Sequence, residues 1–166
     1  AEKKIYALRQ GRNTAGLEPI SKILIDVYDQ LSQAAKSGSS LPGLATGLHD
    51  LDRKIMGLNK SDLILIASRP GMGKTSIALN IALHVAKTSG KTVAVFSLEM
   101  PKEQLVQRML CTEAKVNQGK IRAGMASEED FKRMSKVLTP LAQASIYLDD
   151  TGAITVNEMR TKCRKL

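Results

Sequence analysis

The sequence has few residues of the kinds that bind metals or form disulfides, and it has no long apolar stretch. It contains two cysteines and two histidines in 166 residues, and neither pair has partners at metal-ligand spacing. We therefore expect Cys111 and Cys163 to be reduced thiols, and His49 and His84 to be structural. No run approaches the roughly 20 apolar residues that span a bilayer, and no apolar run follows the charged N-terminus as in a signal peptide. We expect a soluble, cytoplasmic protein.

Aromatic residues are also scarce, at 3%, whereas basic residues exceed acidic ones and give a formal net charge of +9. A chain of this length with 43% hydrophobic residues can form one domain with its own core. An excess of positive charge suits a polyanionic partner such as nucleic acid. The basic residues of segment 160–165 fit that interpretation, but they fit a solvent-exposed helix face equally well.

Two segments of different character follow one another along the chain. Residues 1–38 predict a helical arm, with one helix over 1–10 and a second that begins at Pro19 and ends near the Ser-Gly-Ser-Ser of 37–40. Residues 39–166 alternate apolar runs with helical patterns, which indicates an α/β domain whose parallel sheet is flanked by helices.

The pattern of the second segment predicts individual elements. Apolar runs bounded by turn residues predict buried parallel strands over 62–67, 92–97 and 145–148. Helices are predicted over 48–55 with Thr46 as its cap, over 74–88 and after Pro101. Capping-box patterns at Ser127–Asp130 and at Thr155 with Glu158 predict two further helix starts. Because a mean sheet has about 5–6 strands, we expect the sheet to be C-terminally incomplete in this chain.

A phosphate-binding pattern lies between the first predicted strand and the helix after it. Its residues are Ser68, Arg69, Pro70, Gly71, Met72, Gly73, Lys74, Thr75 and Ser76, with Ser68 at the usual position of the first glycine. A strand–loop–helix context presents backbone N–H groups and a helix N-terminus to an anion. We therefore predict that this segment binds ATP with Mg²⁺. An ordinary glycine-containing turn is the alternative.

Residue types within the loop match the chemistry of a triphosphate. Gly71 and Gly73 permit positive φ and let the backbone approach the phosphates closely. Lys74 supplies a point charge to the β- and γ-phosphates, and Thr75 offers a hydroxyl to Mg²⁺.

Three acidic residues follow the second and third predicted strands. Glu99 ends the second strand, at the sheet edge where α/β proteins bind ligands, and either orients an attacking water or starts a helix. Asp149 and Asp150 either hold magnesium through water or cap a turn before Gly152. Arg108 faces either the nucleotide or a neighbouring subunit or, as we prefer, solvent.

The segments Arg-Pro-Gly-Met-Gly-Lys-Thr (69–75) and Ser-Leu-Glu-Met (97–100) resemble those of bacterial replicative helicases of the DnaB type. The resemblance extends over nearly the whole chain and includes segments 46–52, 146–151 and 160–166. It implies a RecA-like ATPase core with ATP and Mg²⁺ between subunits, with Lys74 and Glu99 as catalytic residues and Glu99 as the base. It also implies a Walker B strand beyond residue 166, which argues against Asp149 and Asp150 in that role.

The resemblance further implies a homohexameric ring that translocates on single-stranded DNA and unwinds the fork, in contact with a primase and a helicase loader. Residues 1–38 resemble the linker of that family, whose helix docks on a neighbouring subunit. This chain alone is expected to bind nucleotide weakly, with little or no turnover. A RecA-like recombinase or clock-type ATPase, and a nucleotide-binding interaction module without catalysis, remain the alternatives.

Overall fold

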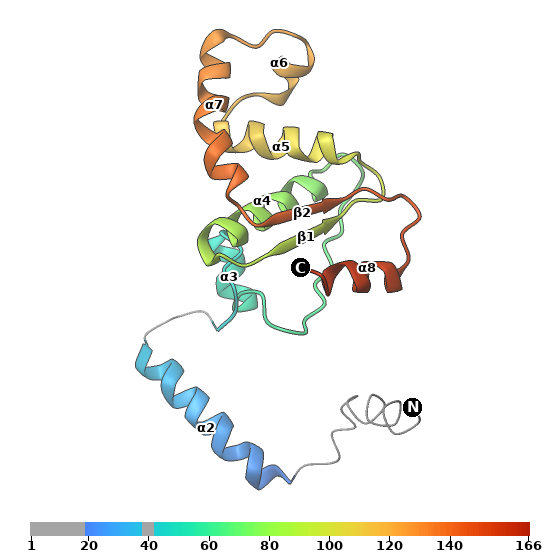
Figure 1. Ribbon diagram of the computed structural model, residues 1–166. Helices are drawn as coiled ribbons and strands as arrows, with labels where there is room; N and C mark the ends of the chain where they lie inside the picture. The colour runs from blue at the N-terminus through green and yellow to red at the C-terminus, as the bar shows by residue number, and fades with distance from the viewer. Residues whose placement is uncertain (1–18, 38–41) are drawn as a thin grey trace. The chain divides into compact units, whose positions relative to one another are not determined.

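The structure, a computed structural model, describes residues 19–37 and 42–166. The chain divides into two units, residues 1–40 and residues 41–166. The helix predicted over 1–10 lies outside the described residues. The described helix of the first unit, α2 (Ile20–Ser37), confirms the helix predicted after Pro19 (Figure 1).

Helix α2 is amphipathic. Ile20, Leu24 and Ile25 are exposed, and so are the apolar side chains of Ile23, Val27 and Tyr28. Nothing within the first unit covers this apolar side of α2 among its described residues. None of the helices in residues 19–37 and 42–166 is both long and apolar enough to cross a membrane.

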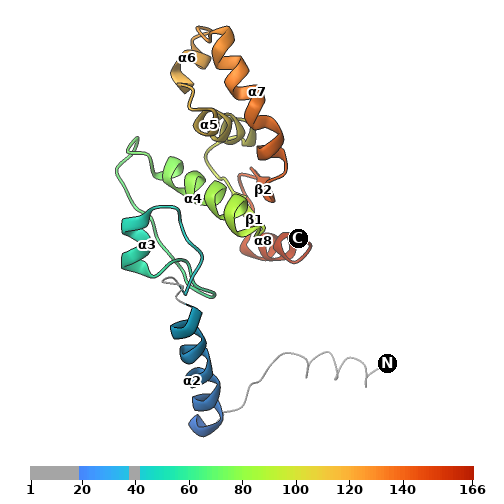
Figure 2. The same ribbon diagram turned by 90° about the vertical axis from the view of Figure 1, so that its left-hand side faces the viewer.

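The second unit contains two strands and six described helices. Their bounds are α3 (His49–Ile55), α4 (Lys74–Ser89), β1 (Val93–Phe96), α5 (Lys102–Ala114), α6 (Gln118–Arg122), α7 (Glu128–Ala142), β2 (Ile146–Asp149) and α8 (Val156–Cys163). Figures 1 and 2 show α4 and α5 on one side of the strands, with α6 and α7 beyond α5. The alternation of strands and helices confirms the predicted α/β class.

The sheet is built by β1 and β2, which run parallel with Val93 opposite Ile146 and Phe96 opposite Asp149. Both strands match the apolar runs predicted over 92–97 and 145–148. Because side chains alternate along a strand, each strand presents one set of residues to the helices α4 and α5 and the other set to the opposite face.

The main core lies between the strands and helices α4 and α5. Leu79 and Leu83 of α4 and Leu105 and Met109 of α5 are at most 4% exposed, and the half-buried Val95 of β1 packs against them. On the opposite face of the sheet, α8 contributes Lys162 and Leu166 follows it, next to Ala94, Phe96 and Tyr147. The core therefore fixes α4 and α5 relative to β1 and β2.

A second cluster holds the outer helices together. The cluster is formed by Ala114 at the end of α5, Val116 in the following turn and Met134 of α7, which are 5–8% exposed. Ser127 caps α7 with a complete capping box, since its hydroxyl accepts from the Asp130 N–H and the Asp130 carboxylate accepts from the Ser127 N–H. Thr155 and Glu158 form the same motif at the start of α8, so both predicted capping boxes are confirmed.

The strand predicted over 62–67 is wrong for this structure. Residues 62–69 have no regular secondary structure, and Leu63 and Leu65 are 85% and 84% exposed. A strand needs a hydrogen-bonded neighbour, and β1 and β2 form a two-stranded sheet in the described residues that does not include this segment. The segment is apolar as the pattern indicates, but no partner buries it here.

The predicted cap of α3 also differs. The cap position is Leu48, with no side-chain hydrogen bond, while the Thr46 hydroxyl accepts from the Leu48 N–H at 3.2 Å. The buried carboxylate of Asp52 reaches back to the Thr46 N–H at 2.8 Å. The segment before α3 is thus fixed by a side chain inside the helix, which a simple capping pattern does not show.

Candidate functional site

The phosphate-loop segment has the backbone geometry that its glycines predict. Gly71 and Gly73 have φ values of 77° and 88°, in the left-handed region that an L side chain rarely adopts. A Cβ atom built on either glycine would meet no atom within 4 Å, so the backbone conformation, and not crowding, requires glycine there. Helix α4 begins directly after this turn, at Lys74.

The start of α4 leaves its first N–H groups without a side-chain cap. Gly73 occupies the cap position and has no side chain to accept from them. Inside the loop, the Met72 N–H donates to the Arg69 carbonyl at 3.2 Å, so that amide is already paired within the loop. A helix start with unpaired amides and no capping acid fits an anionic group such as a phosphate.

One large cavity joins the loop to the second predicted motif. Its volume is about 590 Å³, and its polar lining residues are Lys74, Thr75, Ser97 and Glu99. Most of its other lining residues are apolar and come from α4 and β1. The structure thus brings Lys74, Thr75 and Glu99 to one cavity, whereas Ser68–Gly73 and Ser76 do not line it.

Glu99 lies in a short loop between β1 and α5, not in the first turn of the helix. The Ser97 hydroxyl donates to the Met100 carbonyl at 2.7 Å and accepts from the Met100 N–H at 3.1 Å. The Ser97 N–H donates to the Asp149 carbonyl at 2.8 Å, which extends the β1–β2 ladder into this loop. Glu99 is therefore exposed and lies outside the first turn of α5, in a loop whose backbone is clamped by the Ser97 hydroxyl.

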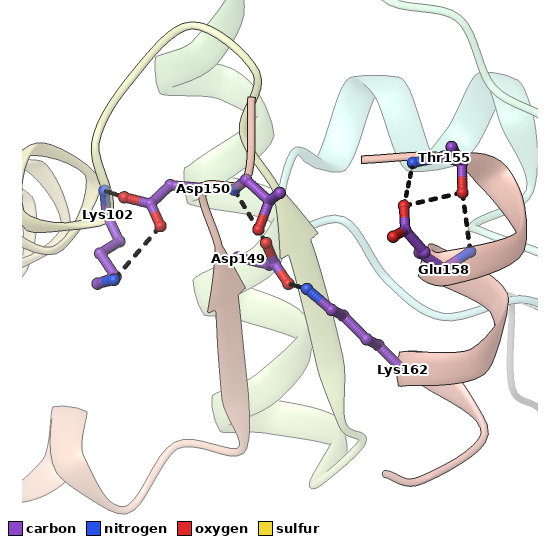
Figure 3. Close-up of polar contacts among 7 residues, drawn as sticks. Lys102, Asp149, Asp150, Thr155, Glu158 and Lys162 are labelled. Atoms are coloured by element: carbon purple, nitrogen blue, oxygen red, sulfur yellow. Dashed lines mark hydrogen bonds and ion pairs between the residues drawn. The ribbon is translucent and has the colours of Figure 1, made fainter. Parts of the chain in front are cut away.

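Asp149 and Asp150 point to lysines on two different elements (Figure 3). Asp149 pairs with Lys162 of α8 and accepts from the Thr151 N–H at 3.0 Å, and these contacts, Lys162 foremost, lower the pKa of Asp149 to about 2. Asp150 accepts from the Lys102 N–H at 3.2 Å, which holds its pKa below the usual value. Both carboxylates therefore fix the loop between β2 and α8, and neither lines the large cavity.

Arg108 is half-buried and contacts Ser76 of α4, so it is not the fully solvent-facing arginine that the preferred interpretation expects. Its Nη1 donates to the Ser76 hydroxyl at 3.4 Å, and its Nε atom is buried without a partner among the described residues. The cysteines are free thiols, with Cys111 buried and Cys163 exposed, and His84 lies against Gly47.

Sequence reasoning missed two features of this region. The Ser97 clamp involves a residue type that commonly hydrogen-bonds to nearby backbone, so its position just before Glu99 was a usable signal. The Arg108–Ser76 contact joins residues 32 positions apart. No local pattern indicates such a pair.

Comparison with known proteins identifies a family. The DnaB-like helicase C-terminal domain matches residues 43–166. The chain is similar over its whole length to the replicative DNA helicase DnaC of Bacillus subtilis (strain 168), at 43% identity, and to the replicative DNA helicase DnaB of Geobacillus stearothermophilus, at 40% identity. The chain spans 37% of the length of each of these relatives.

Solved structures of the same family have a similar fold. One solved ATPase domain is similar with a TM-score of 0.79 and 30% identity, and the match covers 90% of this chain and 52% of that one. A DnaB-like replicative helicase, described with its interactions with primase, is similar with a TM-score of 0.77 and 27% identity, over 99% of this chain and 39% of that one. The fold is therefore that of the RecA-like ATPase domains of these helicases.

Proposed function

Since this chain belongs to the family of DnaB-like helicase C-terminal domains, we propose that it is the nucleotide-binding part of a bacterial replicative DNA helicase. In the whole protein, ATP hydrolysis drives translocation on single-stranded DNA and unwinding of the duplex at the replication fork. The observation that supports this most directly is the single cavity lined by Lys74, Thr75 and Glu99. The match to replicative helicases favours this function over a recombinase or clock-type ATPase.

The phosphate loop, residues 68–76, binds ATP in this proposal. Backbone N–H groups around Gly71 and Gly73 and at the uncapped start of α4 donate to the phosphate oxygens. Lys74 would contact the β- and γ-phosphates, and the Thr75 hydroxyl would hold Mg²⁺. When bound, Mg²⁺ would offset the negative charge of the phosphates.

Glu99 acts as the catalytic base. Its carboxylate orients the attacking water and accepts a proton from it, which requires a fixed position relative to Lys74 and Thr75. The Ser97 clamp supports that position, because it ties the loop to β2 and closes it on Met100, just before α5. Lys74 contributes to catalysis by stabilising charge on the transferred phosphoryl group.

The apolar part of the cavity, along α4 and β1, is the place for a further strand of a longer chain. It is lined by β1, which pairs with β2 within the described residues, and by the apolar side of α4. The exposed Leu63 and Leu65 of the segment before the loop also need a partner. A strand between β1 and 62–67 would supply a backbone partner for this segment and extend the sheet beside the phosphate loop. The 166 residues alone are therefore expected to bind ATP weakly and to have little or no turnover.

The proposed partners follow from the family. They are single-stranded or forked DNA, further copies of the same chain in a homohexamer, a primase and a helicase loader.

Residues 1–38 form the helical linker, and residues 39–166 form the first part of the ATPase domain. Helix α2 uses its exposed apolar residues to dock on a neighbouring subunit. The protein works in the cytoplasm, at the replisome.

The test is steady-state ATP hydrolysis by the complete protein with Glu99→Gln. The expected result is a fall in kcat of about 10²-fold or more with little change in ATP affinity, because the amide keeps the shape of the side chain but cannot take a proton. The control is Glu103→Gln, which changes an acid in the first turn of α5 that does not line the cavity. Unchanged kcat in Glu99→Gln would remove Glu99 from the mechanism.

A further inference from the structure

The loop that carries Glu99 is tied to the end of β2 at two points. At the start of the loop, the Ser97 N–H donates to the Asp149 carbonyl at 2.8 Å. At its end, where α5 begins, the Lys102 N–H donates to the Asp150 carboxylate at 3.2 Å. The last residue of β2 and the residue that follows it therefore hold both ends of this loop.

The Asp150 carboxylate supplies the cap that α5 lacks in its own sequence. Pro101 occupies the cap position of α5 and makes no side-chain hydrogen bond. The Lys102 N–H belongs to the first turn of the helix, whose N–H groups have no partner within the helix. Asp150 Oδ2 accepts from this N–H, and Asp150 Oδ1 lies 3.3 Å from the Lys102 Nζ atom (Figure 3). A negative charge at this place also suits the positive end of the α5 dipole.

The backbone contact is the stronger of the two contacts that Asp150 makes with Lys102. The Lys102 side chain is 54% exposed, and an ion pair with so exposed an ammonium contributes little. The Asp150 side chain is 29% exposed, and its hydrogen bond from the Lys102 N–H is the main cause that lowers its pKa. The carboxylate is therefore charged at neutral pH and accepts strongly from the backbone.

Glu99 depends on this backbone for its position. Its side chain is exposed, so packing does not hold the carboxylate in place. The buried core holds Met100 and Leu105, and the contact with Asp150 fixes the exposed start of α5 between them. A catalytic base works only within a narrow range of distances and angles. A small shift of this turn would therefore move Glu99 relative to the phosphate loop.

We propose that Asp150 is a positioning residue for ATP hydrolysis, which holds the Glu99 loop in place by accepting from the first N–H of α5. This inference rests on the proposed role of Glu99 as the base. Asp150 does not line the cavity that contains Glu99, so it acts through the loop and not on the nucleotide. Its removal is therefore expected to change kcat and not ATP affinity.

The test is steady-state ATP hydrolysis and equilibrium ATP binding by the complete protein with Asp150→Ala and with Asp150→Asn. Asp150→Ala removes the acceptor and is expected to lower kcat about tenfold, with ATP affinity unchanged within about twofold. Asp150→Asn keeps an oxygen that can accept from the Lys102 N–H, and it is expected to retain most of the kcat. If Asp150→Ala does not fold, Asp150→Ser replaces it, because its polar side chain is one atom too short for this contact.

A double substitution shows whether Asp150 acts through Glu99. Adding Asp150→Ala to Glu99→Gln is expected to lower the residual kcat by less than about twofold, because the position of the loop no longer matters once the base is lost. The matched control is Glu158→Ala, which removes the carboxylate that accepts from the Thr155 N–H at the start of α8. It is expected to lower the urea midpoint comparably to Asp150→Ala and to leave kcat unchanged.

Three results would overturn the positioning role while leaving the role of Glu99 intact. In the first, Asp150→Ala keeps its kcat although Glu99→Gln loses it. In the second, Asp150→Asn loses as much kcat as Asp150→Ala. In the third, the loss is as large in the Glu99→Gln background, or Glu158→Ala lowers kcat equally. If Glu99→Gln itself keeps the normal kcat, the assignment of the base fails, and the positioning role of Asp150 fails with it.

Discussion

The helical region α5–α7 and the segment before the phosphate loop are both rich in apolar residues, yet buried apolar side chains occur only in the first. Leu105 of α5 is 1% exposed, whereas Leu65 of the segment is 84% exposed. A helix pairs its own backbone groups and needs only one apolar face covered, which α5 and α7 do for each other. A strand needs a neighbour for its backbone as well as cover for its side chains.

The comparison shows which segments are stabilised by contacts within the described residues and which segment lacks a partner. The outer helices have local caps, such as Ser127 with Asp130, and a small buried cluster of their own. The phosphate loop has its local turn geometry at Gly71 and Gly73, but the segment that leads into it is open. We infer that the 166 residues alone have stable outer helices and a phosphate loop whose support on one side is incomplete.

The largest expected difference between the two regions comes from shortening one leucine in each. Leu105→Ala removes a fully buried side chain and is expected to lower the free energy of unfolding by about 2–5 kcal/mol. Leu65→Ala in the same chain is expected to change it by at most about 0.5 kcal/mol, as for exposed positions generally. Urea unfolding of both variants measures this, and equal losses would contradict the contrast drawn here.

The phosphate loop provides the next test. Gly73→Ala puts a side chain at a φ of 88°, at a cost of about 1–2 kcal/mol for a left-handed residue. Because the loop is exposed, we expect this cost to appear mainly in ATP binding, as a loss of affinity of about 5- to 30-fold.

Gly152→Ala is the matched control for the loop variant. Gly152 is not among the positive-φ glycines, and a Cβ atom there would meet nothing within 4 Å. Fluorescence titration with a labelled ATP analogue compares the two. An equal loss in both variants would show that the effect is not due to the loop conformation.

A smaller effect is expected at the cap of α7. Ser127→Ala removes the hydroxyl that accepts from the Asp130 N–H and is expected to lower the free energy of unfolding by about 1 kcal/mol. Ser135→Ala, inside the same helix, is expected to be close to neutral, since its hydroxyl only donates to the Lys132 carbonyl. If both substitutions have the same effect in urea unfolding, α7 does not depend on its cap.

The smallest effect concerns acid stability at the end of β2. The folded-state pKa of Asp149 is lowered from 3.8 to about 2. The unfolded chain therefore binds the proton more tightly, so the stability from the Lys162 contact is present above about pH 4 and is lost as the pH falls toward 2. In Lys162→Met this part of the pH dependence is expected to shrink, which urea midpoints between about pH 5 and pH 2 would measure. An unchanged profile would show that the pair does not contribute.

Local sequence patterns were sufficient to predict much of this fold. The capping boxes at Ser127 and Thr155 predicted two helix starts, and the apolar runs before Ser97 and Asp150 predicted both strands. The glycine spacing predicted the positive φ values of the phosphate loop. Each of these features depends on residues a few positions apart, where backbone preferences and side-chain hydrogen bonds act directly.

Features that depend on distant residues were not predictable in this way. The apolar run 62–67 is a sound strand pattern, but whether it becomes a strand depends on a neighbour elsewhere in the chain. Asp149 and Asp150 gave no sign that Lys162 and Lys102 would neutralise them, and Arg108 gave none that it would reach Ser76. In each case the partner lies 13 or more positions away.

The most direct test of the ATP site is Mg²⁺-dependent ATP binding by the complete protein and by Lys74→Ala, with Lys91→Ala as an exposed-lysine control outside the cavity. We expect Lys74→Ala to weaken ATP binding by about tenfold or more, because it removes a charge-assisted contact to the phosphates. Lys91→Ala is expected to bind as the unmodified protein does. Equal ATP affinity in all three proteins would contradict the assignment of residues 68–76 as the nucleotide site.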